Sequence, residues 1–249
     1  MALRLTWSAR RQLLYYTVAA VAAAIILYAG YRALFEAPPS CFDHQQNEGE
    51  RGVDCGGPCS LVCTPDTKPL AVLWSRVFEA SPGYYTAAAY VQSNNLSAGA
   101  KGVPYSFQLF DDKNSLVVEK DGIVDIPPVE VMPIIETNIP VGTRQVARAL
   151  FAFGATPVWQ TTSVPSLRVS DENLSPDGTQ LSATLNNDTL YDAGKVTVVA
   201  VLFDSQGTAQ AASKSVVDSP KKSSHPVVFT WPRGVAGVAR AEITVLPSF

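Results

Sequence analysis

Residues 195–204 read Lys-Val-Thr-Val-Val-Ala-Val-Leu-Phe-Asp, and this run decides the fold class of the chain. Turn-forming residues flank it on both sides, Asp192-Ala193-Gly194 before it and Ser205-Gln206-Gly207 after it. A short apolar run between two turns predicts a buried β-strand.

Similar short runs surround this strand, and helical periodicity is absent from the region. They cover residues 181–185, 209–217, 227–231 and 239–246. Proline donates no hydrogen bond to a neighbouring strand, so the prolines that interrupt the pattern are expected at sheet edges. These are Pro157, Pro220, Pro226 and Pro232.

Three landmarks recur along the chain at a nearly constant spacing. Asn94-Asn95, Leu109-Phe110-Asp111 and Ala147-Arg148-Ala149 return as Asn186-Asn187, Leu202-Phe203-Asp204 and Ala239-Arg240-Ala241, at offsets of 92, 93 and 92 residues. A constant shift across separated landmarks indicates a duplication, with residues 70–160 and 166–249 as the two copies. A copy of about 90 residues with about seven short strands suits an immunoglobulin-like β-sandwich.

Neither copy contains a cysteine, so each sandwich is expected to depend on its own apolar core. Large aromatic side chains contribute most to such cores. The expected anchors are Trp74, Tyr90, Phe107, Phe151, Trp159, Phe203, Phe229 and Trp231.

The strand ends of both copies carry a family-like signature. Phe107-Gln108-Leu109-Phe110-Asp111 resembles the F-x-L-Y-D motif of the bacterial FxLYD domain. The second copy keeps the Leu, the aromatic residue and the Asp in Ala200-Val201-Leu202-Phe203-Asp204. The resemblance implies an extracytoplasmic β-sandwich without an assigned biochemical role.

Four cysteines lie within 23 residues, at Cys41, Cys55, Cys59 and Cys63. An even number of cysteines in a short exported segment predicts two disulfides, and the sequence leaves three pairings open. A zinc site made of four thiolates is the alternative, but such sites normally use paired C-x2-C spacings, which are absent here.

Acidic and amide side chains fill the loop between the first two cysteines. Asp43, Asn47, Glu50 and Asp54 are the candidate ligands of a calcium ion, because Ca²⁺ prefers oxygen ligands. The alternative is that these acids are simply solvated on an exposed loop. Calcium is the one cofactor that the sequence suggests.

The same stretch resembles short Cys-x-Asp…Asn…Glu…Asp-Cys-Gly-Gly-x-Cys modules of bacterial envelope and surface proteins. The matching positions are Cys41, Asp43, Asn47, Glu50, Asp54, Cys55, Gly56, Gly57 and Cys59. The resemblance implies an architectural module of the cell envelope.

Residues 12–31 contain no charge, and twenty helical residues at about 1.5 Å each span the hydrocarbon core of a membrane. Arg4, Arg10 and Arg11 precede this segment, and no acidic residue occurs before Glu36. The positive-inside rule therefore predicts a cytoplasmic amino terminus and a carboxyl terminus outside the cell membrane. A cleaved signal peptide is the alternative, but the stretch is longer than such signals and lacks an A-x-A site.

These patterns together predict a mainly β protein with two tandem immunoglobulin-like β-sandwiches, preceded by one transmembrane helix and a small disulfide-rich module. The expected parts are a cytoplasmic tail (1–11), a transmembrane helix (12–35), a cysteine-rich module (36–65), a first sandwich (66–162) and a second sandwich (163–249).

Composition narrows the function. The net charge of -3 gives no basic field for nucleic acid, the chain has only two histidines, and the common enzyme signatures are absent. We therefore expect a non-enzymatic adhesion or envelope-assembly protein whose partners are the membrane and other envelope proteins or a surface ligand, with no catalytic residues. The alternative is an envelope hydrolase or carbohydrate-processing protein that uses carboxylates such as Asp111 and Asp112.

Overall fold

The structure is a computed structural model that describes residues 7–35 and 40–249. The chain divides into two compact units, residues 1–54 and residues 55–249. Residues 1–6, which include Arg4, and residues 36–39, at the start of the predicted cysteine-rich module, lie outside the described residues.

One long helix, one short 3-10 helix and a series of strands follow one another along the described chain. They are α1 (Trp7–Phe35), η1 (Thr64–Asp66), β1 (Ala71–Ser81), β2 (Tyr84–Gln92), β3 (Ala98–Phe110), β4 (Leu116–Ile126), β5 (Val131–Pro140), β6 (Arg148–Phe153), β7 (Trp159–Thr161), β8 (Arg168–Leu174), β9 (Gln180–Asn187), β10 (Lys195–Phe203), β11 (Ala209–Asp218), β12 (Ser223–Thr230) and β13 (Arg240–Leu246).

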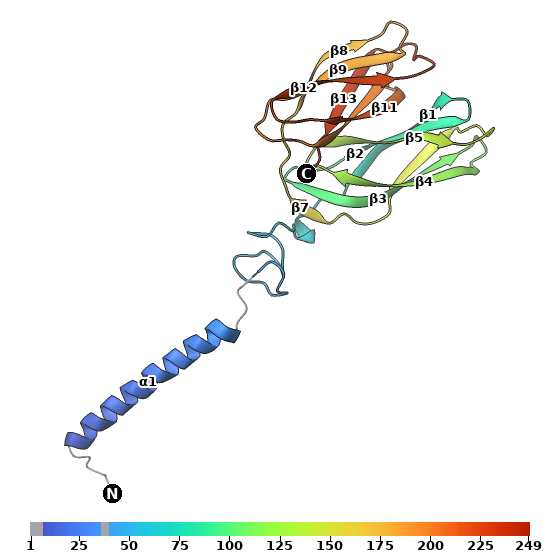
Figure 1. Cartoon of the computed structure of the whole chain (residues 1–249). Helices are drawn as coiled ribbons and strands as arrows, with labels where there is room; N and C mark the ends of the chain where they lie inside the picture. The colour runs from blue at the N-terminus through green and yellow to red at the C-terminus, as the bar shows by residue number, and fades with distance from the viewer. Residues whose placement is uncertain (1–6, 36–39) are drawn as a thin grey trace. The chain divides into compact units, whose positions relative to one another are not determined.

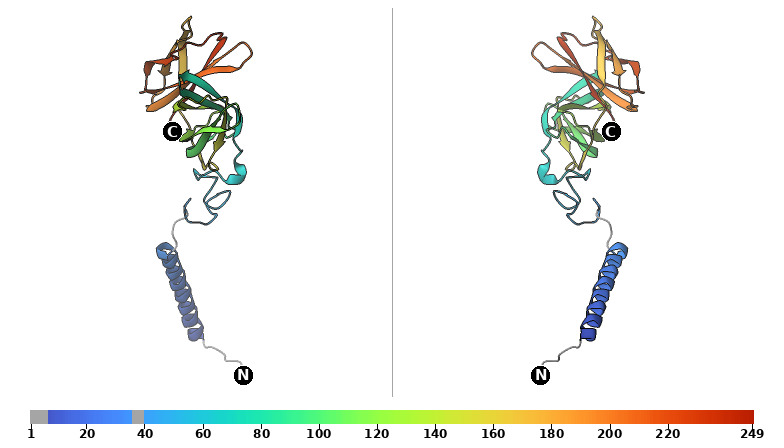
Figure 2. Two further views of the ribbon diagram at one scale, coloured as in Figure 1. Left: turned by 90° about the vertical axis from the view of Figure 1, so that its right-hand side faces the viewer. Right: turned by 90° about the vertical axis from the view of Figure 1, so that its left-hand side faces the viewer.

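The described strands form four antiparallel sheets, which are stacked in layers (Figure 1) and can be followed from both sides in Figure 2. The first sandwich contains the sheets β1-β2-β5 and β4-β3-β6, with β7 paired to β3. The second sandwich contains β11-β10-β13 and β12-β9-β8. An apolar core fills each sandwich, so the predicted β-sandwich fold class is confirmed.

β10 is buried on both of its faces, which explains its continuous apolar sequence. Successive side chains of a strand point to opposite faces of the sheet. Val198, Ala200 and Leu202 belong to the core of the second sandwich, whereas Val199 and Val201 face the first sandwich. A strand covered on both sides carries apolar residues at nearly every position.

A third apolar cluster, which we call the joint, connects the two sandwiches. The ring of Tyr90 stacks on Trp74 with centroids 4.5 Å apart, and Phe203 meets both rings edge-on. Tyr90 Oη donates a hydrogen bond of 3.1 Å to Glu242 Oε1, and burial together with this carboxylate raises the pKa of Tyr90. The expectation that each sandwich depends on its own core alone is wrong for these three rings, because they lie between the sandwiches.

Two of the three recurring landmarks form the same local structure in both sandwiches, whereas Asn94-Asn95 follow β2 and Asn186-Asn187 end β9. Arg148 pairs with Phe110 across β6 and β3, and its guanidinium lies 4.3 Å from the centre of that ring. Arg240 pairs with Phe203 across β13 and β10 in the same way, at 4.4 Å. β10 therefore corresponds to β3, and β13 corresponds to β6.

The joint nevertheless uses different sheets of the two copies. It covers the β11-β10-β13 sheet of the second sandwich but the β1-β2-β5 sheet of the first. In the first sandwich, the corresponding face of β3 is not part of the joint. This face carries Ser106 and Gln108, 93 residues before Val199 and Val201 of β10. The two valines are therefore apolar because the joint covers them, and the two corresponding residues of β3 are polar.

α1 begins at Trp7, earlier than the predicted segment 12–35. Arg10 and Arg11 lie in its first turns, because arginine is a good helix former. The prediction starts at residue 12 because it uses the uncharged residues, which mark the part of the helix suited to the hydrocarbon core and not the whole helix. The helix is long and apolar enough to span a membrane from Trp7 to Arg32, and none of that window is buried in protein.

Residues 55–63 extend the first sandwich. Leu61 bridges to Gln160 of β7, Val62 N donates to Trp159 O at 2.9 Å, and the disulfide between Cys55 and Cys63 closes this segment. The second part of the cysteine-rich stretch is thus tied to the sheet by main-chain hydrogen bonds.

Candidate binding cleft

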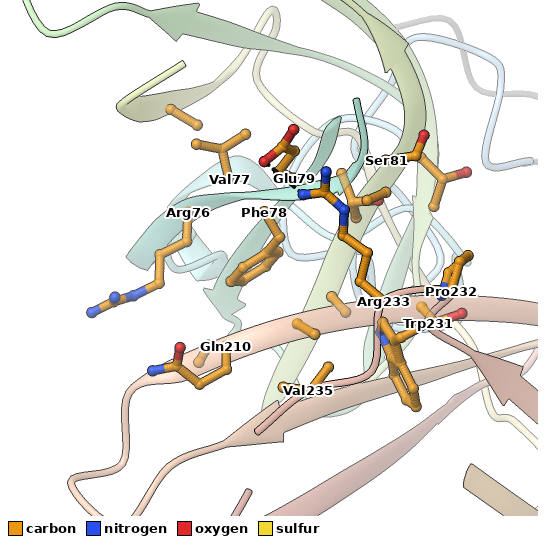
Figure 3. Close-up of a pocket in the computed structure, with 18 of the residues that line it drawn as sticks. Arg76, Val77, Phe78, Glu79, Ser81, Gln210, Trp231, Pro232, Arg233 and Val235 are labelled. Atoms are coloured by element: carbon orange, nitrogen blue, oxygen red, sulfur yellow. Dashed lines mark hydrogen bonds and ion pairs between the residues drawn. The ribbon is translucent and has the colours of Figure 1, made fainter. Parts of the chain in front are cut away.

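A cleft of about 1120 Å³ lies beside the joint, between the two sandwiches (Figure 3). Consecutive residues of β1 (74–81) and of β11 with its preceding residue (208–214) form two of its walls. A turn after β12, residues 230–236, forms a third wall. We call this feature the inter-sandwich cleft.

A tight turn brings an indole and a guanidinium to the cleft. Trp231-Pro232-Arg233-Gly234 follow β12, and Gly234 N donates to Trp231 O at 2.9 Å. Proline at the second position and glycine at the fourth are preferred in type I turns, and Gly234 has φ +67°. Arg233 extends from this turn toward β1 (Figure 3).

A second turn supports the first. Trp231 N donates to Thr179 O at 2.8 Å, and Val235 N donates to Gly178 O at 3.1 Å. Asp177 Oδ1 fixes the second turn by accepting hydrogen bonds from Ser175 Oγ (2.6 Å) and Thr179 N (3.1 Å). The position of Trp231 therefore depends on the loop between β8 and β9.

These hydrogen bonds make the second turn sensitive to acid. The hydroxyls of Ser175 and Thr179 and the backbone N–H of Thr179 lower the pKa of Asp177 from 3.8 to about 2. A pKa that is lower in the folded state stabilises the fold at pH values above the pKa of the unfolded state, and this stability is lost as the pH falls from about 4 to about 2.

Asp177→Asn is therefore expected to reduce the loss of stability over that range, measured by denaturant unfolding of the full chain in detergent. Parallel pH curves for the variant and the parent would contradict this role.

Basic side chains outnumber acidic ones around the cleft. Arg76, Lys214 and Arg233 line it, together with a single carboxylate, Glu79. Arg148 is also a lining residue, but its guanidinium lies over the ring of Phe110 and donates to Asn114 Oδ1 at 3.0 Å. An anionic occupant would therefore meet a favourable potential, although the chain as a whole carries a net charge of -3.

These cations differ in how they are engaged. Arg233 Nη1 forms an ion pair of 2.9 Å with Glu79 Oε2, in which both side chains are about half exposed (50% and 41%). Lys214 Nζ donates to Ile135 O at 2.8 Å. Arg76 is exposed and has no hydrogen bond or ion pair with another described residue, and its charge helps to lower the pKa of Asp204.

Trp231 carries an unsatisfied donor at the cleft. Its side chain is only 8% exposed, and its Nε1 has no hydrogen-bond partner among the described residues. A buried indole N–H without an acceptor is unfavourable by about 1–3 kcal/mol, so such a group gains from a ligand that supplies an oxygen.

The lining offers binding groups and little catalytic chemistry. It contains no histidine or cysteine, and its one carboxylate is paired with Arg233. Cations, an indole N–H and strand edges can hold an anionic chain in place.

Of the two carboxylates proposed for an alternative catalytic site, Asp111 and Asp112, the structure explains Asp111 as a turn residue. Asp111 Oδ1 accepts hydrogen bonds from Lys113 N (3.0 Å) and Ser115 N (2.8 Å), and the pKa of Asp111 is lowered by these contacts and by Arg144. Asp204 forms the same turn in the second copy, at 2.9 Å to both backbone N–H groups. This is the ordinary use of Asp after a strand.

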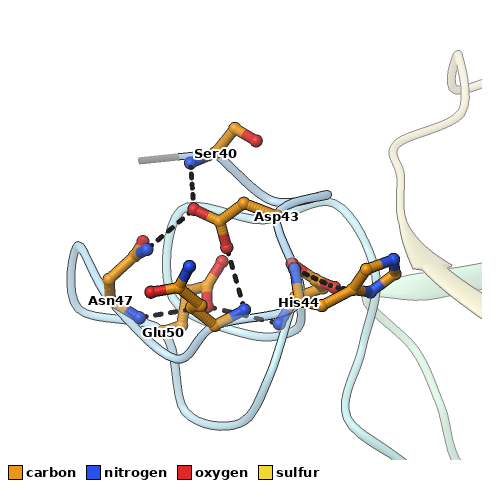
Figure 4. Close-up of polar contacts among 7 residues, drawn as sticks. Ser40, Asp43, His44, Asn47 and Glu50 are labelled. Atoms are coloured by element: carbon orange, nitrogen blue, oxygen red, sulfur yellow. Dashed lines mark hydrogen bonds and ion pairs between the residues drawn. The ribbon is translucent and has the colours of Figure 1, made fainter. Parts of the chain in front are cut away.

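Three of the four candidate calcium ligands, Asp43, Asn47 and Glu50, lie together in one loop (Figure 4), and hydrogen bonds connect Asp54 to the same loop. Asn47 Nδ2 donates to Asp43 Oδ2 at 2.8 Å, and Glu50 Oε2 accepts hydrogen bonds from Asn47 N (3.3 Å) and Asp54 N (3.2 Å). The carboxylates thus already organise the backbone of the loop. Calcium binding at these residues stays a prediction.

His44 lies in the same loop, and Asp54 holds its backbone and its ring by hydrogen bonds. It has φ +60°, a conformation that favours glycine, and its backbone N–H donates to Asp54 Oδ1 at 3.1 Å. Its Nδ1 also lies 3.0 Å from Asp54 Oδ2. Hydrogen bonds from Asn47 and Ser40 lower the pKa of Asp43 in the same loop.

All four cysteines are disulfide-bonded, and none is free. Cys55 pairs with Cys63, with Cα atoms 5.1 Å apart. The zinc alternative needs thiolates, which oxidised cysteines do not supply.

Sequence reasoning missed the inter-sandwich cleft. Trp231 was expected only as a core residue, and Arg76, Glu79 and Arg233 carried no recognisable motif. The turn signal Trp-Pro-Arg-Gly at 231–234 was the available clue, since it predicts a tight turn that exposes its third residue. No family model matches this chain, and no curated protein matches it in sequence.

Proposed function

We propose that this chain is a single-pass membrane protein that holds a fused pair of β-sandwiches outside the cytoplasm and binds an envelope protein or surface ligand there, without catalysing a reaction. The observation that carries the proposal is α1, whose membrane-length apolar window is not buried by any of the described residues. Leu13, Ile26 and Leu27 are 55%, 70% and 73% exposed.

An apolar helix of this length needs a nonaqueous environment, and a bilayer supplies it. The oxidised cysteines support a location outside the cytoplasm, because thiols are kept reduced in most cytoplasms. Arg10 and Arg11 near the amino-terminal end of α1 favour the orientation with that end in the cytoplasm. The inter-sandwich cleft supports a binding role.

Topology is tested with reporters fused after Phe249. Alkaline phosphatase folds only outside the cytoplasm and green fluorescent protein fluoresces in it, so we expect an active phosphatase fusion and a dark fluorescent fusion. The protein should stay in the membrane after an alkaline wash, and its intact mass should include α1. The matched control replaces Arg4, Arg10 and Arg11 with Ala, which should increase the inverted fraction.

Two results would contradict the proposal. A mature protein that lacks α1 would show a cleaved signal instead of an anchor. A fluorescent fusion together with an inactive phosphatase fusion would place the sandwiches in the cytoplasm.

A further inference from the structure

We propose that the inter-sandwich cleft receives an extended, acidic segment of a partner protein, which adds to the edge of β1 or β11 that is not paired within its sheet. This inference deepens the proposed binding function by naming the chemistry of the partner. It rests on four features of the cleft: its charge, its strand edges, its unsatisfied indole and its ion pair.

Charge selects an anionic occupant. Arg76, Lys214 and Arg233 against the one carboxylate of Glu79 form a basic region on a chain whose net charge is -3. Arg76 and Arg233 are exposed, so carboxylates of a partner can reach their guanidinium groups. Guanidinium groups bind carboxylates in a bidentate geometry that a point charge does not provide.

Strand edges select a polypeptide over another polyanion. β1 pairs along one edge with β2, and β11 pairs along one edge with β10. Consecutive residues of both strands line the cleft, as expected when a strand presents its edge and not only one face. Unpaired main-chain N–H and C=O groups at such an edge bind an extended peptide by adding a strand.

The indole of Trp231 supplies a directional contact. Trp231 lines the cleft and also packs in the core of the second sandwich, and its buried Nε1 has no hydrogen-bond partner among the described residues. A main-chain carbonyl or carboxylate oxygen of an entering segment that reaches this N–H is a suitable acceptor. This hydrogen bond would remove the free-energy cost of a buried donor without an acceptor, so it would strengthen binding of the segment.

The ion pair between Arg233 and Glu79 acts against the same occupant. An acidic segment must compete with Glu79 for Arg233, whose Nη1 lies 2.9 Å from Glu79 Oε2. Removing the charge of Glu79 should therefore strengthen binding, whereas removing the charge of Arg233 should weaken it. Variants of two neighbouring, half-exposed residues are thus expected to change affinity in opposite directions.

The test uses the purified full chain in detergent and measures fluorescence anisotropy of labelled peptides. The probe is a ten-residue peptide of alternating Glu and Val, which favours an extended strand. A Lys-Val peptide controls for charge. A Glu-Pro peptide keeps the charge, but it lacks the main-chain N–H of every second residue and its prolines are disfavoured in a paired β-strand. Polygalacturonate represents an anionic polysaccharide.

We expect the Glu-Val peptide to bind at least about tenfold more tightly than either control peptide, and raised salt to weaken it. Arg233→Gln and Arg76→Gln should each weaken binding about tenfold, and Glu79→Gln should strengthen it several-fold. Trp231→Phe keeps an aromatic ring but loses the N–H, and it should weaken binding several-fold. Arg168→Gln, which removes an exposed cation on β8 outside the cleft lining, is the matched control and should have no effect.

Several outcomes would overturn the inference. They are no binding of the Glu-Val peptide at about 1 mM, equal binding of the Glu-Pro peptide, stronger binding of polygalacturonate, or an equal loss in Arg168→Gln. Because the assay does not depend on membrane orientation, its failure is distinguishable from a failure of the topology experiment. A negative topology result with specific peptide binding would leave the cleft assignment intact.

Discussion

Val201→Asn is expected to lower the free energy of unfolding by about 3 kcal/mol, since it removes buried apolar volume and places an amide where no partner is available. Val201 is fully buried in the joint. The variant should also lose near-ultraviolet circular dichroism from the stacked Trp74 and Tyr90, because their packing against the second sandwich loosens. Denaturant unfolding of the full chain in detergent, followed by tryptophan fluorescence, measures the first effect.

The duplication provides a matched control for this substitution. Gln108 occupies the position of Val201 in the first copy, 93 residues earlier, and it faces away from the joint. Gln108→Asn should change the free energy of unfolding by less than about 1 kcal/mol, because only a partly exposed hydrogen bond to Glu119 is affected. Similar losses in both variants would show that the joint contributes little to stability.

Gly178→Ala is expected to be at least as damaging as Val201→Asn, with a loss of about 3–4 kcal/mol. Gly178 has φ +65°, and a Cβ at this position would lie 2.3 Å from Val235 O and 2.8 Å from Val235 N. Both are backbone atoms of the turn that follows β12, so the two turns must separate. Unfolding midpoints measure the loss, and the affinity for the Glu-Val peptide should fall because Trp231 and Arg233 move with that turn.

Gly207→Ala is the control for the backbone conformation alone. Gly207 has φ +76°, but a Cβ there would meet nothing within 4 Å. It should therefore lose only about 1–2 kcal/mol, from the left-handed backbone conformation. A loss in Gly178→Ala no larger than in this control would mean that the contact with Val235 is unimportant.

The strands of the second sandwich could be predicted from local sequence, because turns bracket each apolar run. The segments 181–185, 209–217 and 239–246 lie in β9, β11 and β13, with ends that differ by a few residues. The recurring landmarks could be found for the same reason, since each one forms a local turn or strand pair.

The cleft could not be predicted in this way. Glu79 and Arg233 are separated by 154 residues, and they meet only because the two sandwiches pack against each other. The position of Tyr90 in the joint could not be predicted for the same reason. The sequence shows that an aromatic residue in a strand is buried, but not whether the opposite sheet of its own sandwich or the other sandwich covers it. Tertiary packing between the copies decides both features.

The joint has a consequence for assembly between molecules. It pairs two unlike faces of one repeated unit, and repetition of a contact of this head-to-tail kind produces a ring or an open filament. On the two remaining faces, polar residues stand at the positions that the joint uses: Ser106 and Gln108 on one, and Gln180 and Ser182, at the positions of Ala88 and Tyr90, on the other. The exposed Leu150 and Val228 pair with Gln108 and Ser182 across the strands. Polar side chains lose hydration on burial, so we expect these positions to weaken a further contact of this kind between molecules.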